Sequence, residues 1–177
     1  MVNPGFTYSL PVLRVLENEH RFLSHLMNEW HAIVLDFEKG IYSREKGLDA
    51  LKQLRKLVIE FIDPLKNHTE KEEGYLFPML SKYVGSEQGP IQAVQEEHEE
   101  IDAYIGHFLH HTRGDLSQFT LEMMEDVVKD AGEAFEVIMI HFVKEENVVF
   151  PMVESVLRAK EQDELFEQMY TSILPKS

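Results

Sequence analysis

Two segments of this chain, far apart along the sequence, are nearly the same, and their shared pattern limits what the chain can fold into. Residues 68–80 read HTEKEEGYLFPML and residues 141–153 read HFVKEENVVFPMV, so both follow H-x-x-K-E-E-x-x-x-F-P-M. A fainter echo precedes each copy, Glu19-His20 before the first and Glu97-His98 before the second. Recurrence of this kind is the signature of a repeated supersecondary unit. The sequence therefore predicts one helical hairpin used twice.

The stretches between the sparse glycines and prolines have the spacing of long amphipathic helices. In the first stretch the residues of one face recur every three or four positions: Leu13, Leu16, His20, Leu23 and Met27. Helices are predicted over residues 11–39, 43–83 and 91–112, and over a fourth stretch from 115–120 to at least 157. Residues 85–90, GSEQGP, are predicted to be a connection. Pro64 and Pro78 interrupt the second stretch and predict a kink or a tightened turn at each.

The order of these stretches predicts an all-α fold, because period-two alternation is missing. Short connections imply antiparallel neighbours, hence an up-down-up-down four-helix bundle over about 11–158 within a single domain spanning 1–177. A helical tail is predicted over about 161–174, with these residues on one face: Leu165, Phe166, Met169, Tyr170 and Ile173. The tail packs on the bundle in the favoured interpretation, and forms a homodimer contact in the alternative.

Composition and charge exclude several classes of function. The chain has 32 acidic and 17 basic side chains, a formal charge of −15, which disfavours nucleic acid and anionic membrane surfaces as partners. Cysteine is absent, which excludes disulfides and thiolate metal sites. The first residues show no basic region followed by a long apolar run, and no stretch approaches the roughly 18 apolar residues that span a bilayer. A cytoplasmic protein is the expectation.

Each copy of the repeat carries a histidine and a glutamate four residues apart, which lie on one helical face about one turn apart. A lone pair of this kind is more often a helix-surface hydrogen bond than a metal site. Here the pair occurs twice, both times in apolar sequence, and His20 and His98 also fall on apolar faces. Buried histidine and glutamate side chains need partners, because burying such a group without one costs several kcal/mol. Four histidines facing the core are explained by a metal site and not by packing.

The predicted ligands are four imidazoles and two carboxylates: His20, His68, Glu72, His98, His141 and Glu145. Six protein ligands, two of them able to bridge, fit two ions better than one. Imidazole and carboxylate without thiolate suit iron, and also manganese or zinc. An oxo, hydroxo or water bridge is expected to complete the shell.

With these residues the sequence resembles the hemerythrin-like, or HHE cation-binding, family. The resemblance covers the whole bundle through ENEHRFL, HTEKEEGYLFP, EEHEEI and HFVKEENVVFP. It implies a diiron centre with terminal histidines, two bridging glutamates, and chemistry with dioxygen or nitric oxide.

The ligand set departs from that of the oxygen-carrying hemerythrins. Those proteins place a second histidine one turn from the first on the third helix, where this chain has Val94 and Asp102. Their fourth helix uses an aspartate five residues after its histidine, where this chain has Glu146. The set of four histidines and two glutamates is closer to the bacterial iron-centre repair proteins. A ferritin-like site needs Glu-x-x-His on two helices, and only Glu17 and His20 have that spacing.

Three functions follow as hypotheses. The leading one is a diiron protein that binds or senses dioxygen, nitric oxide or a related small species. The second is a diiron enzyme in nitric oxide or peroxide detoxification or in iron-centre repair, and no catalytic residue beyond the ligands stands out. The third is a regulatory or interaction protein whose bundle is stabilised by metal.

Other polar residues are expected to play lesser parts. Asp102 is interpreted as an exposed carboxylate rather than a seventh ligand, and Tyr75 as a core side chain or a donor beside the site. Glu73 and Glu146 are expected to be solvated or to pair with Lys71 or Lys144. The remaining histidines are expected on the surface or behind the ligands: His25, His31, His107, His110 and His111.

Overall fold

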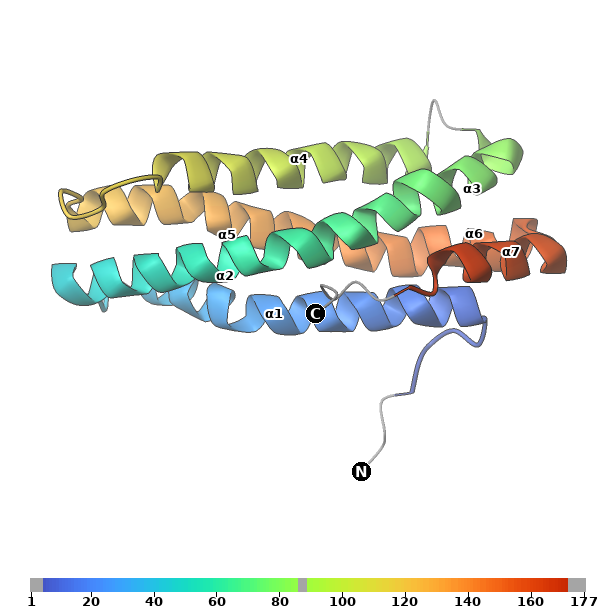
Figure 1. Ribbon diagram of the computed structural model, residues 1–177, viewed down its shortest axis with the longest axis horizontal. Helices are drawn as coiled ribbons and strands as arrows, with labels where there is room; N and C mark the ends of the chain where they lie inside the picture. The colour runs from blue at the N-terminus through green and yellow to red at the C-terminus, as the bar shows by residue number, and fades with distance from the viewer. Residues whose placement is uncertain (1–4, 86–88, 172–177) are drawn as a thin grey trace. The chain divides into compact units, whose positions relative to one another are not determined.

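The computed structural model describes residues 5–85 and 89–171, which contain helices and no strand (Figure 1). The long helices are α1 (Pro11–Glu38), α2 (Arg44–Lys71), α4 (Pro90–His111) and α5 (Leu121–Lys144). Two π-helices, η1 (Glu72–Leu76) and η2 (Glu145–Val149), continue α2 and α5 into α3 (Phe77–Val84) and α6 (Phe150–Val156). The last helix is α7 (Ala159–Met169). The predicted all-α bundle with an additional C-terminal helix is confirmed.

The helix ends agree closely with the sequence-based expectation. α1 is followed by Gly40, whose φ of +66° lies in the left-handed region where glycine meets no steric cost. The predicted second stretch, residues 43–83, corresponds to α2, η1 and α3 together. The predicted connection at residues 85–90 includes residues 86–88, which lie outside the described residues.

The chain divides into two compact units, and every long helix contributes a segment to each of them. The first unit comprises Met1–Leu23, Asp63–Glu96 and His141–Ser177, and the second comprises Ser24–Ile62 and Glu97–Ile140. In each unit the four segments alternate in chain direction, because each long helix ends in the unit where the next one begins. The single domain expected from the chain length stays a prediction.

The core of the first unit contains side chains from seven of its helical segments and from the residue that follows α6. Its fully buried members include Leu13, Leu16, Leu76, Leu80, Val94, Val149, Phe150, Val153, Leu165 and Met169. Leu165 and Met169 belong to α7, which packs against η1. The C-terminal tail therefore packs on the helices of this unit, which agrees with the favoured interpretation of the sequence. Phe166 and Tyr170, predicted on the same face, are 37% and 62% exposed, and Ile173 lies outside the described residues.

The core of the second unit is built around Trp30, which is fully buried. Its indole Nε1–H donates to the main-chain oxygen of Ala131 at 3.1 Å, and its ring meets Phe61 edge-on with centroids 5.3 Å apart. A buried tryptophan needs a partner for its N–H, and this bond supplies it. None of the helices in the described part of the chain is long and apolar enough to cross a lipid bilayer.

Candidate metal centre

The two copies of the repeat form the same local structure in the first unit. In each copy the histidine, His68 or His141, lies in the last turn of a long α-helix. The glutamate four residues later, Glu72 or Glu145, is the first residue of the π-helix. The repeat therefore places one predicted ligand at the end of the α-helix and the other at the start of the π-helix. Short π-helical turns within α-helices are frequent at functional sites.

The proline that ends each repeat gives a physical reason for the wide turn. The N–H of Phe77 donates to the carbonyl of Glu72, and that of Phe150 to the carbonyl of Glu145, so each bond spans five residues instead of four. In an α-helix the following proline, Pro78 or Pro151, would clash with the carbonyl four residues earlier and leave it without a donor. The alternative of a tightened turn at Pro78 was wrong, because the turn before it is widened. α2 continues through Pro64 as an α-helix.

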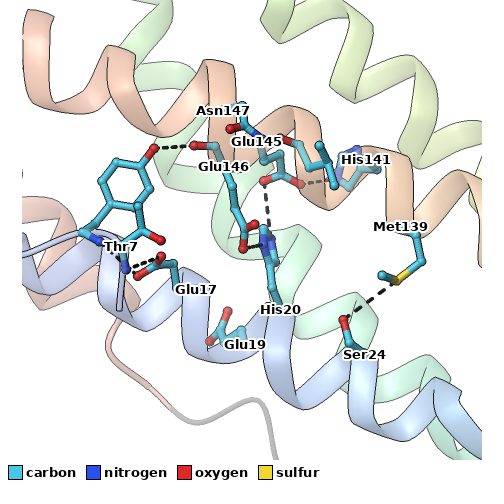
Figure 2. A network of polar contacts seen from close by, with 12 residues as sticks. Thr7, Glu17, Glu19, His20, Ser24, Met139, His141, Glu145, Glu146 and Asn147 are labelled. Carbon is cyan, nitrogen blue, oxygen red and sulfur yellow. Dashed lines mark hydrogen bonds and ion pairs between the residues drawn. The ribbon is translucent and has the colours of Figure 1, made fainter. Parts of the chain in front are cut away.

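Five of the six predicted ligands come together in the first unit, and their side chains are buried. His68 Nε2 lies 2.7 Å from Glu72 Oε1, and His141 Nε2 contacts Glu145 Oε1. His20 reaches the same glutamate from α1, with Nε2 3.9 Å from Glu145 Oε2. Figure 2 shows Glu145 lying between His20 and His141.

The donor atoms form two overlapping groups that share Glu145. His20, His68 and Glu145 offer atoms within 4.8 Å of one another, and so do Glu72, His141 and Glu145. A carboxylate has two oxygens, so one that belongs to two groups can bridge two cations. The two groups therefore form a buried donor cluster that could hold metal, with Glu145 common to both.

The chemistry of these donors fits a metal ion. His20 Nε2 is buried and has no hydrogen-bond partner, although buried polar atoms are nearly always satisfied. Glu72 and Glu145 are 0% exposed, and buried carboxylates require compensating positive charge. A cation between these groups would satisfy both requirements, and imidazole with carboxylate suits iron, manganese or zinc.

The remaining predicted ligand, His98, lies on the α4 segment of the second unit, where it is buried. Its membership of the centre stays a prediction. Asp102 is exposed, as interpreted from the sequence. Tyr75 is 43% exposed, so the expectation of a core position for it was wrong.

The other histidines match their expected surface or outlying positions. Four of them are exposed: His25, His107, His110 and His111. The fifth, His31, is partly buried and stacks on Phe135 with ring centroids 3.8 Å apart.

Two glutamates that the sequence interpretation left outside the site hold the imidazole rings in place. His68 Nδ1 lies 2.9 Å from Glu19 Oε1, and His20 Nδ1 lies 3.1 Å from Glu146 Oε1 (Figure 2 shows the second contact). Metal-binding histidines commonly donate their second N–H to a carboxylate, which fixes the tautomer and turns the other nitrogen toward the ion. Both contacts use Nδ1, so Nε2 of each ring faces Glu145 or Glu72.

These contacts correct the expected pairing of Glu146 and Lys71. Glu146 bonds to His20 rather than to a lysine, and Lys71 pairs with Glu19. The sequence did contain a signal for both carboxylates. Glu19 directly precedes a predicted ligand in a dipeptide that recurs as Glu97-His98, and Glu146 belongs to the glutamate doublet present in both repeats.

Burial and neighbouring charge move the pKa values of the two rings in opposite directions. Burial lowers the pKa of His20 to about 4, because it disfavours the imidazolium, although the hydrogen bond to Glu146 opposes the change. Burial also disfavours the charged form of His68, but Glu72, Glu19 and Glu145 outweigh it and raise the pKa of His68 to about 10. A proton on His68 thus supplies positive charge next to Glu72, and a metal ion bound there would displace it.

Aromatic rings cover the His20 side of the centre. The His20 ring stacks on Phe142 with centroids 4.1 Å apart and on Phe150 at 5.5 Å. Tyr8, from the segment before α1, packs edge-on against Phe150 and donates its hydroxyl to the carbonyl of Glu146. These contacts fix the plane of the imidazole and keep bulk water from it.

A buried set of imidazoles and carboxylates on antiparallel helices defines a metal-binding protein of the helical-bundle class. The chain belongs to the hemerythrin HHE cation-binding domain family, whose model matches residues 11–153. The chain is similar to the iron-sulfur cluster repair protein YtfE of Escherichia coli K12 and of Shigella boydii serotype 18, with 29% identity over 103 residues in each case. That alignment covers 56% of this chain and 46% of each relative, so it spans about half the length of the curated relatives. No solved structure matches the chain.

Substitution of the ligands tests the two overlapping groups. We expect Glu145→Ala to remove most bound metal, because Glu145 is shared by both groups, and His68→Ala to remove the ion of one group. His110→Ala is the matched control, since His110 is exposed, and it should leave the metal content nearly unchanged. Metal counting on purified variants measures this, and the opposite pattern would refute the assignment.

A separate substitution tests the carboxylate behind His20. Glu146→Ala should weaken metal binding by about 10-fold or more, the usual effect of losing a group that orients a ligand. Glu70→Ala is the control, because Glu70 makes an exposed ion pair with Lys66 on α2. Competition with a chelator measures the affinities, and equal affinities in the two variants would show that Glu146 does not orient His20.

Proposed function

We propose that this protein is a non-haem diiron protein that binds or senses a small diatomic molecule, dioxygen or nitric oxide. The observation that carries the proposal is the sharing of Glu145 between two groups of buried donors. Family membership supports metal binding, and the donor set without thiolate supports iron, with manganese and zinc as alternatives. His98 is proposed as a further ligand of the second group.

The surroundings of the donors favour a small ligand of low charge. The donor side chains in the first unit are 0–3% exposed, so a peptide, nucleotide or sugar would not reach them. Phe142 and Phe150 present apolar surface on the His20 side, which does not stabilise a charged substrate. Six protein ligands on two irons would leave coordination positions open, and the irons would supply the electrons that a diatomic ligand needs.

The protein residues have distinct parts in this proposal. Glu72 and Glu145 would neutralise the charge of the bound cations, and the histidines would supply nitrogen donors. Glu19 and Glu146 hold Nδ1 of His68 and His20, so that each ring presents Nε2. The aromatic side chains limit access of water to the centre.

A second candidate is catalytic, namely turnover of nitric oxide or peroxide or repair of iron centres. The observation that favours it is the similarity to proteins named for iron–sulfur cluster repair. Because this chain spans about half the length of those relatives, their activity is carried over as a proposal alone. The reduced protein should consume nitric oxide or peroxide faster than an equal amount of free iron, and failure to do so would exclude this candidate.

A third candidate is regulatory, with metal binding stabilising a bundle that contacts a partner. Metal-dependent melting with no redox change and no response to nitric oxide would favour it. The exposed rings of Phe166 on α7 and of Tyr170, the residue that follows it, offer an apolar surface for a second copy of the chain. Light scattering would test the proposed homodimer.

The leading proposal predicts a specific spectrum and metal content. Protein purified anaerobically from iron-fed cells should contain about two irons per chain, and oxidation should produce the near-ultraviolet bands of a bridged diiron centre. Zinc would give no such bands. Nitric oxide added to the reduced protein should change its spectrum, and the Glu145→Ala variant should not respond. Iron-free protein from such cells would contradict the proposal.

A further inference from the structure

The C-terminal helix α7 lies outside the segment that the family model matches, yet it is built into the first unit. The match ends at residue 153, and α7 spans Ala159–Met169. Leu165 and Met169 are 0% exposed in the core of this unit. α7 also packs against η1, the π-helix that begins with the predicted ligand Glu72.

A buried lysine links the end of α7 to a metal ligand. The Nζ of Lys71 donates to the carbonyl of Thr171, two residues beyond α7, and pairs with Glu19 Oε2. The other oxygen of Glu19 lies 2.9 Å from His68 Nδ1. Thr171, Lys71, Glu19 and His68 thus form a continuous series of polar contacts in which both charged side chains are 6–7% exposed.

Each contact in this series depends on its neighbours. A buried ammonium is stable only when it is paired and hydrogen-bonded, and here Glu19 pairs with it while the Thr171 carbonyl accepts a further hydrogen bond. Without the ammonium, Glu19 would keep only its contact with His68, and loss of the ion pair favours rotation of its side chain toward water. Rotation would release the Nδ1 side of His68 and with it the orientation of Nε2.

The carboxylate behind His20 is held differently. The side chain of Glu146 is 37% exposed, and the group that donates to its main-chain carbonyl is the Tyr8 hydroxyl. Water can therefore solvate Glu146 directly, whereas the solvation of Glu19 is replaced by Lys71. The influence of α7 is directed at His68 rather than at His20.

We propose that α7 and Lys71 form a C-terminal brace that holds Glu19 on His68 and slows loss of metal from the group containing His20, His68 and Glu145. Lys71 is a positioning residue, because it acts through Glu19 and does not reach the donors itself. The inference rests on the proposed metal pair and adds to it the control of one of the two positions by a segment outside the family's shared bundle.

The brace predicts a selective change in metal release from the full-length, iron-loaded protein. In Lys71→Met, one of the two iron equivalents should be lost to a ferrous chelator about 10-fold faster, and the other at the wild-type rate. Lys71→Arg keeps the charge and should restore most of the wild-type behaviour. Lys66→Met, on the same helix but 69% exposed, is the matched control and should release iron as the wild type does.

The release rates of the two iron equivalents separate positioning by Lys71 from general stabilisation of the fold. If Lys71 only stabilises the fold, both iron equivalents of Lys71→Met will be released faster together, and that result overturns the brace. Release from Lys71→Met that matches the Lys66→Met control also overturns it. If the wild-type protein itself retains no iron pair, the proposed function fails, and this outcome is distinct from both.

Removal of α7 tests whether the helix acts through Lys71. Deletion of the residues after Arg158 should accelerate release of the same iron equivalent, and adding Lys71→Met should change it little further, because coupled groups are not additive. Leu165→Ala, which weakens the docking of α7 without removing it, provides the same test if the deletion fails to fold. Additive effects of the two changes would show that α7 and Lys71 act independently.

Discussion

The fold of the first unit is constrained by the burial of carboxylates among apolar side chains. Glu72 and Glu145 are fully buried, and the free energy of removing such groups from water must be offset by positive charge or by hydrogen bonds. Within the unit that charge is supplied near Glu72 by His68, whose pKa is raised to about 10. A proton, however, neutralises one carboxylate, whereas a bridging metal ion can neutralise two. The helices are thus arranged around a position that suits a cation.

The repeat achieves this arrangement through local backbone geometry. A proline after each ligand pair removes the α-helical hydrogen bond, and the chain responds with a π-turn that starts at the glutamate. The segments on both sides remain helical, so the wide turn changes the direction of the glutamate without ending the helix. The phenylalanine before each proline, Phe77 or Phe150, is buried in the core and anchors the far side of the turn. The placement of the predicted ligands and the packing of the core are therefore two consequences of one motif.

The sequence was sufficient for features that depend on periodicity. The helices and the inward direction of His20, His68 and His141 follow from apolar residues every three or four positions, because one helical face must be buried. The π-turns were missed, because a proline within a helical stretch is compatible with several local distortions. Glu19 and Glu146 were missed for another reason. Each of them lies beside a predicted ligand in the sequence, and only the packing of α1 against the repeats shows which histidine each one contacts.

The two copies of the motif share their sequence but not their surroundings, and this difference gives the centre its asymmetry. α7 packs on η1 of the first copy and brings the Thr171 carbonyl to Lys71, so that the carboxylate behind His68 is paired with a buried ammonium. The carboxylate behind His20 is part of the second copy and is partly exposed to water. A hydrogen bond from an imidazole to an unpaired carboxylate makes the ring a stronger donor than one to a carboxylate already neutralised by an ammonium. His20 and His68 therefore differ in donor strength, and the difference arises from a helix that the repeat itself does not contain.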